Sequence, residues 1–466
     1  MEFSVSLFFF LCLLTQSVSS QNAIAPPRGW NSYDSFSWII SQEEFLQNAE
    51  VLSQRLFPHG YEYAVVDFLW YRSLDGGDLS FGKENKDEWG RLLPDPDRWP
   101  SSIGGHGFKS VADKVHSMGL KFGIHLMAGI STQVVEQNTP ILDTETGGVY
   151  MEAGKEWHAG DIGIKSRACS WMPKSFMAIN LTLGAGRAYL KSIYDLYASW
   201  DVDFVKLDCV FGDNLDIDEI TTVSGILKEL NRSIVLSLSP GVSATPQMAR
   251  QVSGIVNMYR ITGDYWDQWQ QMTDHFNVSR EFASAKLIGI RGLNDSSWPD
   301  LDMLPFGWLT DPGVKQGPHR FTNLSSTEQT TQMTLWSIAK SPLMYGGDMR
   351  NLEENTFNLI TNPTLLEINS NSSNNMEVCF PFQTPGIRSW IATGSGGKVY
   401  VAYFNLNQEN SWILMKTSSL GSELPGRSFA NCQGQDAWNE MNKVTNETLV
   451  ADVEPHGCAL FVLTCT

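Results

Sequence analysis

The sequence predicts an α/β protein: a (β/α)8 TIM barrel followed by a small C-terminal antiparallel all-β domain. Between about residues 28 and 350, short β-rich runs alternate with amphipathic helical patterns, as such a barrel requires. From Ile387 onward, strand-like runs follow one another without helices. Of the 466 residues, 42% are hydrophobic and 18% are charged, so the chain can bury a large core. An open doubly wound sheet is the alternative that this alternation leaves open.

The predicted barrel strands are short runs dominated by apolar residues. In chain order they span Gly29–Ser32, Tyr63–Phe68, Lys121–Leu126, Asp203–Cys209, Ser233–Ser239, Val256–Thr262, Ala285–Ile290 and Pro342–Tyr345. Amphipathic patterns between them predict helices over Ser41–Leu56 and Arg187–Trp200. The first of these opens with Ser41 and Glu44 at the spacing of a capping box.

The residue pattern changes from alternating strands and helices to strands alone after a helix-like stretch at Phe357–Ile368. The polar segment Asn369–Asn375 predicts a turn-rich break. The strands expected beyond it span Arg388–Thr393, Lys398–Asn405, Trp412–Lys416 and Ala459–Thr464. We therefore divide the chain into a signal peptide (1–20), a catalytic barrel (21–370) and a C-terminal β-sandwich domain (376–466).

The first 20 residues have the pattern of a secretory signal. The apolar run Leu7–Leu14 is too short to span a bilayer, and small residues follow it at Ser17–Ser20. Six cysteines remain after Cys12 is removed with the signal, an even number that suggests disulfides in an exported chain. Asn-x-Ser/Thr sequons fit the same route, and they stand at Asn180, Asn231, Asn277, Asn294, Asn323, Asn371 and Asn446. We expect a secreted, cell-wall, vacuolar or lysosomal protein.

The charge balance limits the partners. With 33 Lys+Arg against 51 Asp+Glu, the formal net charge is −18. Nucleic acids and anionic membranes need basic patches, so neither is expected as the main partner. The cysteine and histidine spacings do not resemble a zinc site. We expect no metal and no organic cofactor.

Carboxylates stand at three predicted strand ends. Asp67, Asp208 and Asp264 each close or follow a strand-like run. In an α/β barrel, chemistry is located at the C-terminal ends of the strands. Lys206 and Asp208 lie two residues apart, so both point to the same face, and a cation beside a carboxylate favours the ionised form that a nucleophile requires. Two carboxylic acids across one pocket are the groups that glycoside hydrolysis uses.

Seven fragments in order carry a resemblance to a known family. They are Pro27–Tyr33, Gly60–Asp67, His116–Ile124, Trp200–Asp208, Tyr259–Asp264, Trp298–Leu304 and Ser341–Leu343. Over nearly the whole mature length, the chain resembles glycoside hydrolase family 27, the α-galactosidase (melibiase) family. That resemblance implies the same barrel and C-terminal β domain.

The resemblance also implies roles for individual residues. Asp208 looks like the catalytic nucleophile and Asp264 like the general acid/base. Lys206, Arg260 and Asp302 match positions that hold sugar hydroxyls near the reacting carbon, and Tyr33 stands where relatives usually place a Trp against the sugar. Cys169 and Cys209 resemble a family disulfide near the pocket, although Cys209 stands one place earlier than usual.

The departures from the family pattern concern the sugar. Paired acids after the second strand usually hold the 4- and 6-hydroxyls of galactose, whereas this chain has Asp67-Phe68. The apolar ring favours β-L-arabinopyranose, which has the ring configuration of α-D-galactose without the CH₂OH arm; branches of the family that lack this acid are known as β-L-arabinopyranosidases. His125 stands where many relatives have Tyr. Ser239 stands where α-galactosidases often have an acid, and a small residue there resembles the N-acetylgalactosaminidase branch.

The predicted function is a retaining exo-glycosidase acting on terminal α-D-galactopyranosides, β-L-arabinopyranosides or both. Its partner would be the terminal sugar of an oligosaccharide, glycoprotein or cell-wall glycan. Three alternatives are kept: an α-N-acetylgalactosaminidase, a sugar-binding descendant without activity, and a structural cell-wall protein. The sequence does not indicate the oligomeric state.

Overall fold

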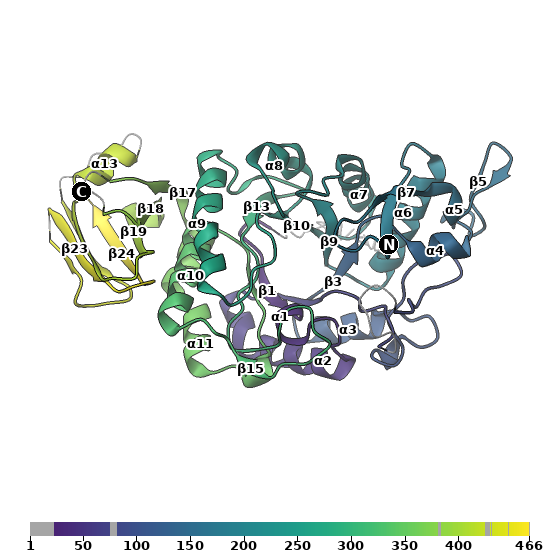
Figure 1. The fold of residues 1–466 in the computed structure, drawn as a ribbon, viewed down its shortest axis with the longest axis horizontal. Helices are drawn as coiled ribbons and strands as arrows, with labels where there is room; N and C mark the ends of the chain where they lie inside the picture. Colours follow the sequence, from purple (N-terminus) through teal and green to yellow (C-terminus); the bar gives the residue numbers. More distant parts are fainter. Residues whose placement is uncertain are drawn as a thin grey trace, which may run out of the picture.

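The computed structural model describes residues 23–74, 82–380, 384–424, 429, 431–445 and 447–465. The predicted signal peptide and the sequon at Asn446 lie outside these residues. The chain forms a central barrel with a separate β domain at one end (Figure 1). Within the described residues, no helix combines the length and the apolar character needed to cross a membrane.

The barrel is built from a curled nine-stranded sheet in the order β12-β13-β11-β10-β9-β3-β2-β1-β16. Only β12 (Ile290–Arg291) pairs antiparallel within it. The other strands run parallel and span β1 Arg28–Asn31, β2 Tyr63–Val66, β3 Lys121–Met127, β9 Phe204–Phe211, β10 Val235–Pro240, β11 Met258–Arg260, β13 Ser296–Asp300 and β16 Leu343–Tyr345. A parallel bridge between Leu304, after β13, and Tyr345 closes the barrel. The closure excludes the open doubly wound alternative.

The predicted seventh strand is wrong. Residues 285–289 turn at the end of α9 (Trp269–Ser284), where Lys286 and Gly289 have φ angles of 60° and 64°. The parallel strand is instead β13, which pairs with β11. It contains Pro299, which cannot donate to a strand ladder, so the local pattern gave no strand signal there.

Helices surround the sheet. Those between the barrel strands are α1 Tyr33–Phe36, α2 Gln42–Val51, α3 Lys109–Ser117, α6 Gly184–Ser199, α7 Ile217–Glu229, α8 Pro246–Val252, α9 and α10 Ser326–Ile338. The capping box predicted at Ser41 and Glu44 is present at the start of α2. The helix predicted over Ser41–Leu56 continues beyond α2 as a π-helical turn, Leu52–Leu56.

A long excursion separates β3 from α6. It contains β4 Ile130–Ser131, α4 Thr132–Gln137, β5 Met151–Glu152, β6 Lys155–Glu156, α5 Ala159–Ile162, β7 Gly163–Ala168 and β8 Phe176–Ile179. Strands β4, β8 and β7 form a small separate sheet in that order. A disulfide between Cys169, after β7, and Cys209, in β9, ties this excursion to the barrel. A short hairpin of β14 Trp308–Leu309 and β15 Arg320–Phe321 precedes α10.

The helix expected over Phe357–Ile368 is two helices, and the expected break after it is wrong. Helices α11 (Glu354–Ile360) and α12 (Pro363–Asn371) are separate because Pro363 cannot continue a helix and instead begins one, capped by the Asn362 side chain. Most of the polar segment 369–375 is ordered as the end of α12 and the start of β17 (Ser373–Val378). The domain division at residues 370 and 376 remains our proposal.

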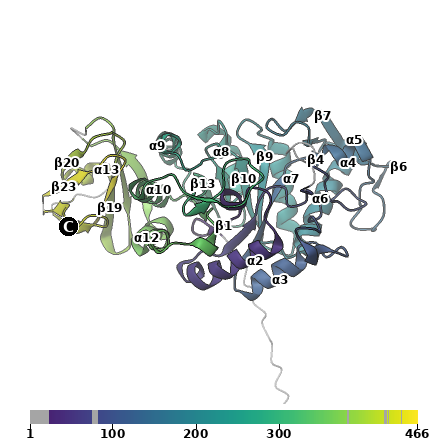
Figure 2. The same ribbon diagram turned by 60° about the horizontal axis from the view of Figure 1, so that its bottom comes forward.

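The C-terminal region folds as two antiparallel sheets over a shared apolar core. One has the order β17-β18-β19-β24-β21, in which the later strands span β18 Ile387–Thr393, β19 Lys398–Asn405, β21 Cys432–Asp436 and β24 Cys458–Cys465. The other has the order β20-β23-β22, and its strands span β20 Ser411–Lys416, β22 Lys443–Val444 and β23 Thr448–Val453. The short helix α13 (Ser419–Glu423) follows β20. Helices α10 and α12 lie between this domain and the barrel strands (Figure 2).

Two of the predicted six mature cysteines remain unpaired. Besides the disulfide at the barrel, Cys432 pairs with Cys465 across the neighbouring strands β21 and β24. Cys379 and Cys458 are free thiols. Four of the six cysteines therefore form two disulfides.

Candidate active site

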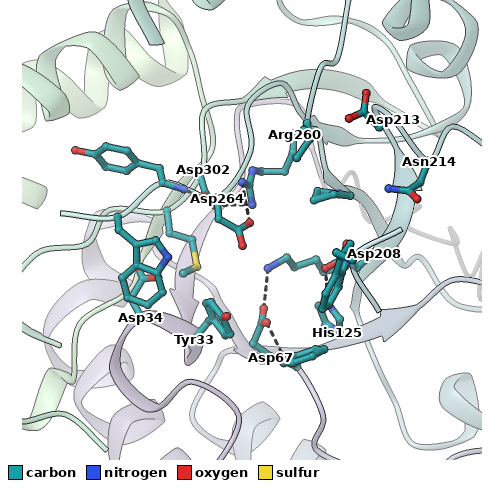
Figure 3. A pocket seen from close by; sticks show the side chains of 18 of the residues that line it. Tyr33, Asp34, Asp67, His125, Asp208, Asp213, Asn214, Arg260, Asp264 and Asp302 are labelled. Carbon is teal, nitrogen blue, oxygen red and sulfur yellow. Dashed lines mark hydrogen bonds and ion pairs between the residues drawn. The ribbon is translucent and has the colours of Figure 1, made fainter. Parts of the chain in front are cut away.

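A cavity of about 450 Å³ opens at the carboxyl ends of the barrel strands. We call it the central cavity. All of the predicted catalytic and sugar-contacting residues except Ser239 line it: Tyr33, Asp67, Phe68, His125, Lys206, Asp208, Arg260, Asp264 and Asp302. Figure 3 shows the space open between Arg260 on one side and Asp67 on the other. Because the sheet closes into a barrel, residues that are far apart in the sequence line the same cavity.

Ser239 is buried in β10 and is not among the cavity-lining residues. Pro240, which follows it, and Val242 line the cavity instead. The substrate-binding role of Ser239, which the resemblance to the N-acetylgalactosaminidase branch suggests, stays a prediction.

Asp67 accepts several hydrogen bonds directly after β2. Its Oδ2 accepts from Lys206 Nζ at 2.9 Å and from Asn31 Nδ2 at 2.6 Å, and its Oδ1 accepts from the backbone N–H of Phe68 at 2.9 Å. Burial disfavours its charge, but Lys206, His125 and these donors outweigh burial and hold the pKa of Asp67 below its usual value. The same attraction raises the pKa of Lys206 despite burial. This pair is an ionised, pre-formed feature of the cavity.

Asp208 lies deeper than Asp264. Its side chain is 11% exposed, and its Oδ2 lies 3.0 Å from Nε2 of the buried His125. Its other oxygen accepts from the backbone N–H of Cys209, which has a φ angle of 61°. Lys206 was expected to pair with Asp208 because both point to one face. The direct ion pair of Lys206 is instead with Asp67, and His125 contacts Asp208.

On the opposite side, one arginine joins two acids. Arg260 ends β11, and its guanidinium lies 2.7 Å from Oδ1 of Asp302 and 3.3 Å from Oδ1 of Asp264. Burial opposes the charge of Arg260, but Asp302 and Asp264 raise its pKa above the usual value. Asp302 also accepts from the backbone N–H of Tyr265 at 2.7 Å. The side chain of Asp264 is 59% exposed, so this acid faces the opening of the cavity.

Aromatic rings form the remaining wall. The Phe68 ring centroid lies 5.5 Å from that of His125, 5.3 Å from Trp171 and 6.4 Å from Tyr33. Trp266 packs against Tyr33 with centroids 5.8 Å apart. The Cys169–Cys209 disulfide anchors the loop that carries Trp171 to the residue after Asp208. An apolar wall therefore faces the charged groups.

Several cavity residues were missed by the sequence reasoning. They are Asp34, Ser170, Trp171, Asp213, Asn214, Pro240, Val242, Tyr265, Trp266 and Met303. Some stand next to predicted site residues in the sequence, such as Asp34 after Tyr33 and Trp266 two residues after Asp264, and that adjacency was the available signal. Asp34 is buried, its Oδ2 has no hydrogen-bond partner among the described residues, and burial raises its pKa well above the usual value. A neutral carboxyl of this kind can donate a hydrogen bond.

The geometry defines a class of protein: a TIM barrel with several carboxylates and two cations around a sugar-sized cavity. The family model described as "Alpha galactosidase A" matches residues 30–137 and 183–371, and the "Alpha galactosidase C-terminal beta sandwich domain" matches residues 384–463. The chain belongs to this α-galactosidase family, glycoside hydrolase family 27, and is a glycoside hydrolase.

Solved structures and curated sequences both include relatives that match most of the chain. A family 27 β-L-arabinopyranosidase from Geobacillus stearothermophilus is 34% identical, with a TM-score of 0.82 over 95% of this chain and 97% of that one. A candidate α-N-acetylgalactosaminidase from Bacillus halodurans is 32% identical, with a TM-score of 0.77 over 95% of this chain and 99% of that one. The α-galactosidase of Oryza sativa subsp. japonica is 25% identical over 94% of this chain and 84% of its own length.

Proposed function

We propose that the protein removes terminal β-L-arabinopyranosyl residues, and more slowly α-D-galactopyranosyl residues, with retention of configuration. The observation that carries this preference is the Phe68 ring beside Asp67 in the cavity wall. Galactose needs a polar partner for its 6-hydroxyl where this apolar ring stands. A buried hydroxyl without its partner costs about 1–3 kcal/mol, which corresponds to roughly 10- to 100-fold in binding. Arabinopyranose has no such arm.

The relatives support the same preference. The Geobacillus protein, described as a β-L-arabinopyranosidase, shares 34% of its residues with this chain, and the rice α-galactosidase shares 25%. The N-acetylgalactosaminide alternative rested on Ser239, which lies outside the cavity lining. A solved relative described as a candidate α-N-acetylgalactosaminidase is 32% identical to this chain, and it keeps that substrate as the alternative.

We infer a double displacement for the chemistry. Asp208 attacks the anomeric carbon while the bond to the leaving oxygen breaks and Asp264 gives that oxygen a proton. Water then attacks the anomeric carbon as Asp264 takes its proton, and the bond between that carbon and the Asp208 oxygen breaks, which frees the sugar and the carboxylate. The deep position of Asp208 and the open position of Asp264 support this division, because the leaving group and the incoming water must reach Asp264 from solvent.

The other cavity groups would position the sugar. Asp67, Lys206, Arg260 and Asp302 offer acceptors and donors for ring hydroxyls, and ion pairs join Asp67 to Lys206 and Arg260 to Asp302. Tyr33 offers a flat face for the sugar ring. We further propose that the protein enters the secretory pathway and meets terminal sugars of oligosaccharides, glycoproteins or cell-wall glycans.

The test is a comparison of kcat/KM for p-nitrophenyl β-L-arabinopyranoside and p-nitrophenyl α-D-galactopyranoside with the purified protein at mildly acidic pH. We expect the pentoside to be preferred by about tenfold or more. An equal or reversed ratio would remove the argument from Phe68. NMR tests retention separately, because a retaining enzyme first releases the sugar with the anomeric configuration of the substrate.

A further inference from the structure

A second hollow, of about 680 Å³, lies between the barrel and the C-terminal domain. We call it the interdomain hollow. One side is formed by the first turns of α10, including Thr327, and the other by β20, β23 and the segment after β21. It shares no lining residue with the central cavity. Its size is in the range of small-molecule sites, about 300–1,000 Å³.

Two tryptophans line the hollow from the C-terminal domain. Alternate residues of β20 point into the sandwich, so Trp412 points outward, and it is 70% exposed. Within the described residues, the Trp412 ring has no aromatic or cationic partner. Trp438 stands on the segment after β21, and its Nε1–H donates to Thr334 Oγ1 at 3.1 Å, which holds its ring in place. The hollow is therefore lined by one exposed, uncovered indole and by a second indole that a hydrogen bond holds in place.

Carboxylates also line the hollow. Asp452 is directly opposite Trp412 in the β20–β23 pairing, so both side chains lie on the same face of the sheet. Asp452 Oδ1 accepts from Asn410 Nδ2 at 3.2 Å, and Glu454 Oε1 accepts from Thr327 Oγ1 at 2.9 Å. Their second oxygens have no hydrogen-bond partner among the described residues. The hollow therefore offers oriented acceptors next to an aromatic face.

This combination matches one ligand chemistry. A pyranose has an apolar C–H face that covers an indole ring and a rim of hydroxyls that donate to carboxylates. The two acids disfavour anionic ligands such as phosphates or uronates. We propose that the interdomain hollow is a non-catalytic binding site for a neutral pyranose unit of a glycan. It would hold the polymer while the central cavity acts on a terminal sugar.

The test uses the full-length protein and affinity electrophoresis in native gels containing neutral arabinogalactan. We expect Trp412→Ala to weaken retardation about tenfold in apparent Kd, because it removes the sugar-facing ring. The matched control is Leu414→Ala on the same strand, which removes an outward apolar side chain that does not line the hollow and should leave retardation unchanged. Asp452→Asn should weaken binding to a smaller degree.

Kinetics complete the test without depending on which small glycoside is preferred. Trp412→Ala should keep the wild-type kcat/KM on p-nitrophenyl glycosides but show a higher KM for release of sugar from the arabinogalactan. Wild-type retardation of Trp412→Ala would overturn the proposal. An equal loss of kcat/KM on the p-nitrophenyl glycosides and on the arabinogalactan would also overturn it. A change in sedimentation without a change in retardation would overturn it too, because the surface would then be an interface between copies of the chain.

Discussion

The charged groups at the bottom of the central cavity and the residues around them come from different parts of the barrel. The first set, which we call the floor, consists of residues on or just after barrel strands that are held by one another: Asp67 with Lys206, Asp208 with His125, and Arg260 with Asp302. The second set, the wall, consists of loop-borne Phe68, Trp171, Asp264 and Trp266. The wall makes mostly ring contacts and one long ion pair.

This difference separates most of the chemistry from selectivity, and the wall acid Asp264, our proposed general acid/base, is the exception. Floor charges are satisfied before sugar arrives, so their geometry costs little reorganisation on binding. The aromatic residues of the wall make few polar contacts within the protein, so they can change without leaving a buried charge unpaired. We therefore expect floor substitutions to lower turnover on every substrate, and substitutions of the wall aromatic residues to redistribute activity among substrates.

The largest effect is expected at the floor. Asp208→Asn keeps the size of the side chain but removes the nucleophilic carboxylate, so kcat should fall on the order of 10⁴-fold or more while the thermal midpoint stays near that of the wild type. Steady-state assays and thermal denaturation measure the two quantities. A variant with a rate within tenfold of wild type would mean that another group is the nucleophile.

Asp264→Asn tests the wall acid. The loss in kcat/KM should be about 10²- to 10⁴-fold for a glycoside with a poor alkyl leaving group, because that oxygen needs a proton as it departs. A 2,4-dinitrophenyl glycoside, whose leaving group departs as the anion, should lose much less in kcat/KM. The same loss on both substrates would contradict the role of Asp264 as a general acid.

Phe68→Asp tests the selectivity of the wall. The ratio of galactoside to arabinopyranoside kcat/KM should rise by roughly 10- to 100-fold, since the new carboxylate supplies the missing hydroxyl partner. Phe68→Leu is the control, because it changes the shape of the wall but stays apolar, and its ratio should remain close to wild type. A rise in both variants would assign the effect to space instead of hydrogen bonding.

The smallest effect is expected outside the cavity, at a buried acid that lacks the cation pairing of the floor. Glu219 in α7 accepts from the backbone N–H of Gly129 at 2.7 Å, and burial raises its pKa to about 7. The folded state therefore binds this proton more tightly than the unfolded state, and the stabilisation is lost as pH rises from about 4.5 through 7. Glu219→Gln should remove at most about 3 kcal/mol of this pH dependence without changing turnover.

Thermal denaturation at several pH values measures this effect. The midpoint of Glu219→Gln minus that of the wild type should grow between pH 5 and pH 8. A constant difference would show that Glu219 does not titrate between the folded and unfolded states in this range.

The sequence predicted most of the fold where local pattern and local structure agree. The strand at Lys398–Asn405 and the capping box at Ser41 occur as expected, because alternation and capping depend on neighbouring residues. It failed at Ser296–Asp300, where Pro299 conceals a barrel strand, and at Pro363, which divides a helix. At Ser296–Asp300, pairing with the distant strand β11 fixed a conformation that the local pattern did not indicate, whereas at Pro363 the proline and its Asn362 cap were a local signal.

For the site, the sequence by itself determined which chemical groups stand on or just after the barrel strands: Asp67, Lys206, Asp208 and Arg260. It did so because alternation along a strand and the order of strands in a barrel fix the face and the level of a side chain. Tertiary structure decided the partners: Lys206 binds Asp67 rather than Asp208, Ser239 lies outside the cavity lining, and a disulfide anchors the loop of Trp171 beside the cavity. Those pairings depend on the register between strands and on loops far apart in the chain, and no local pattern encodes either.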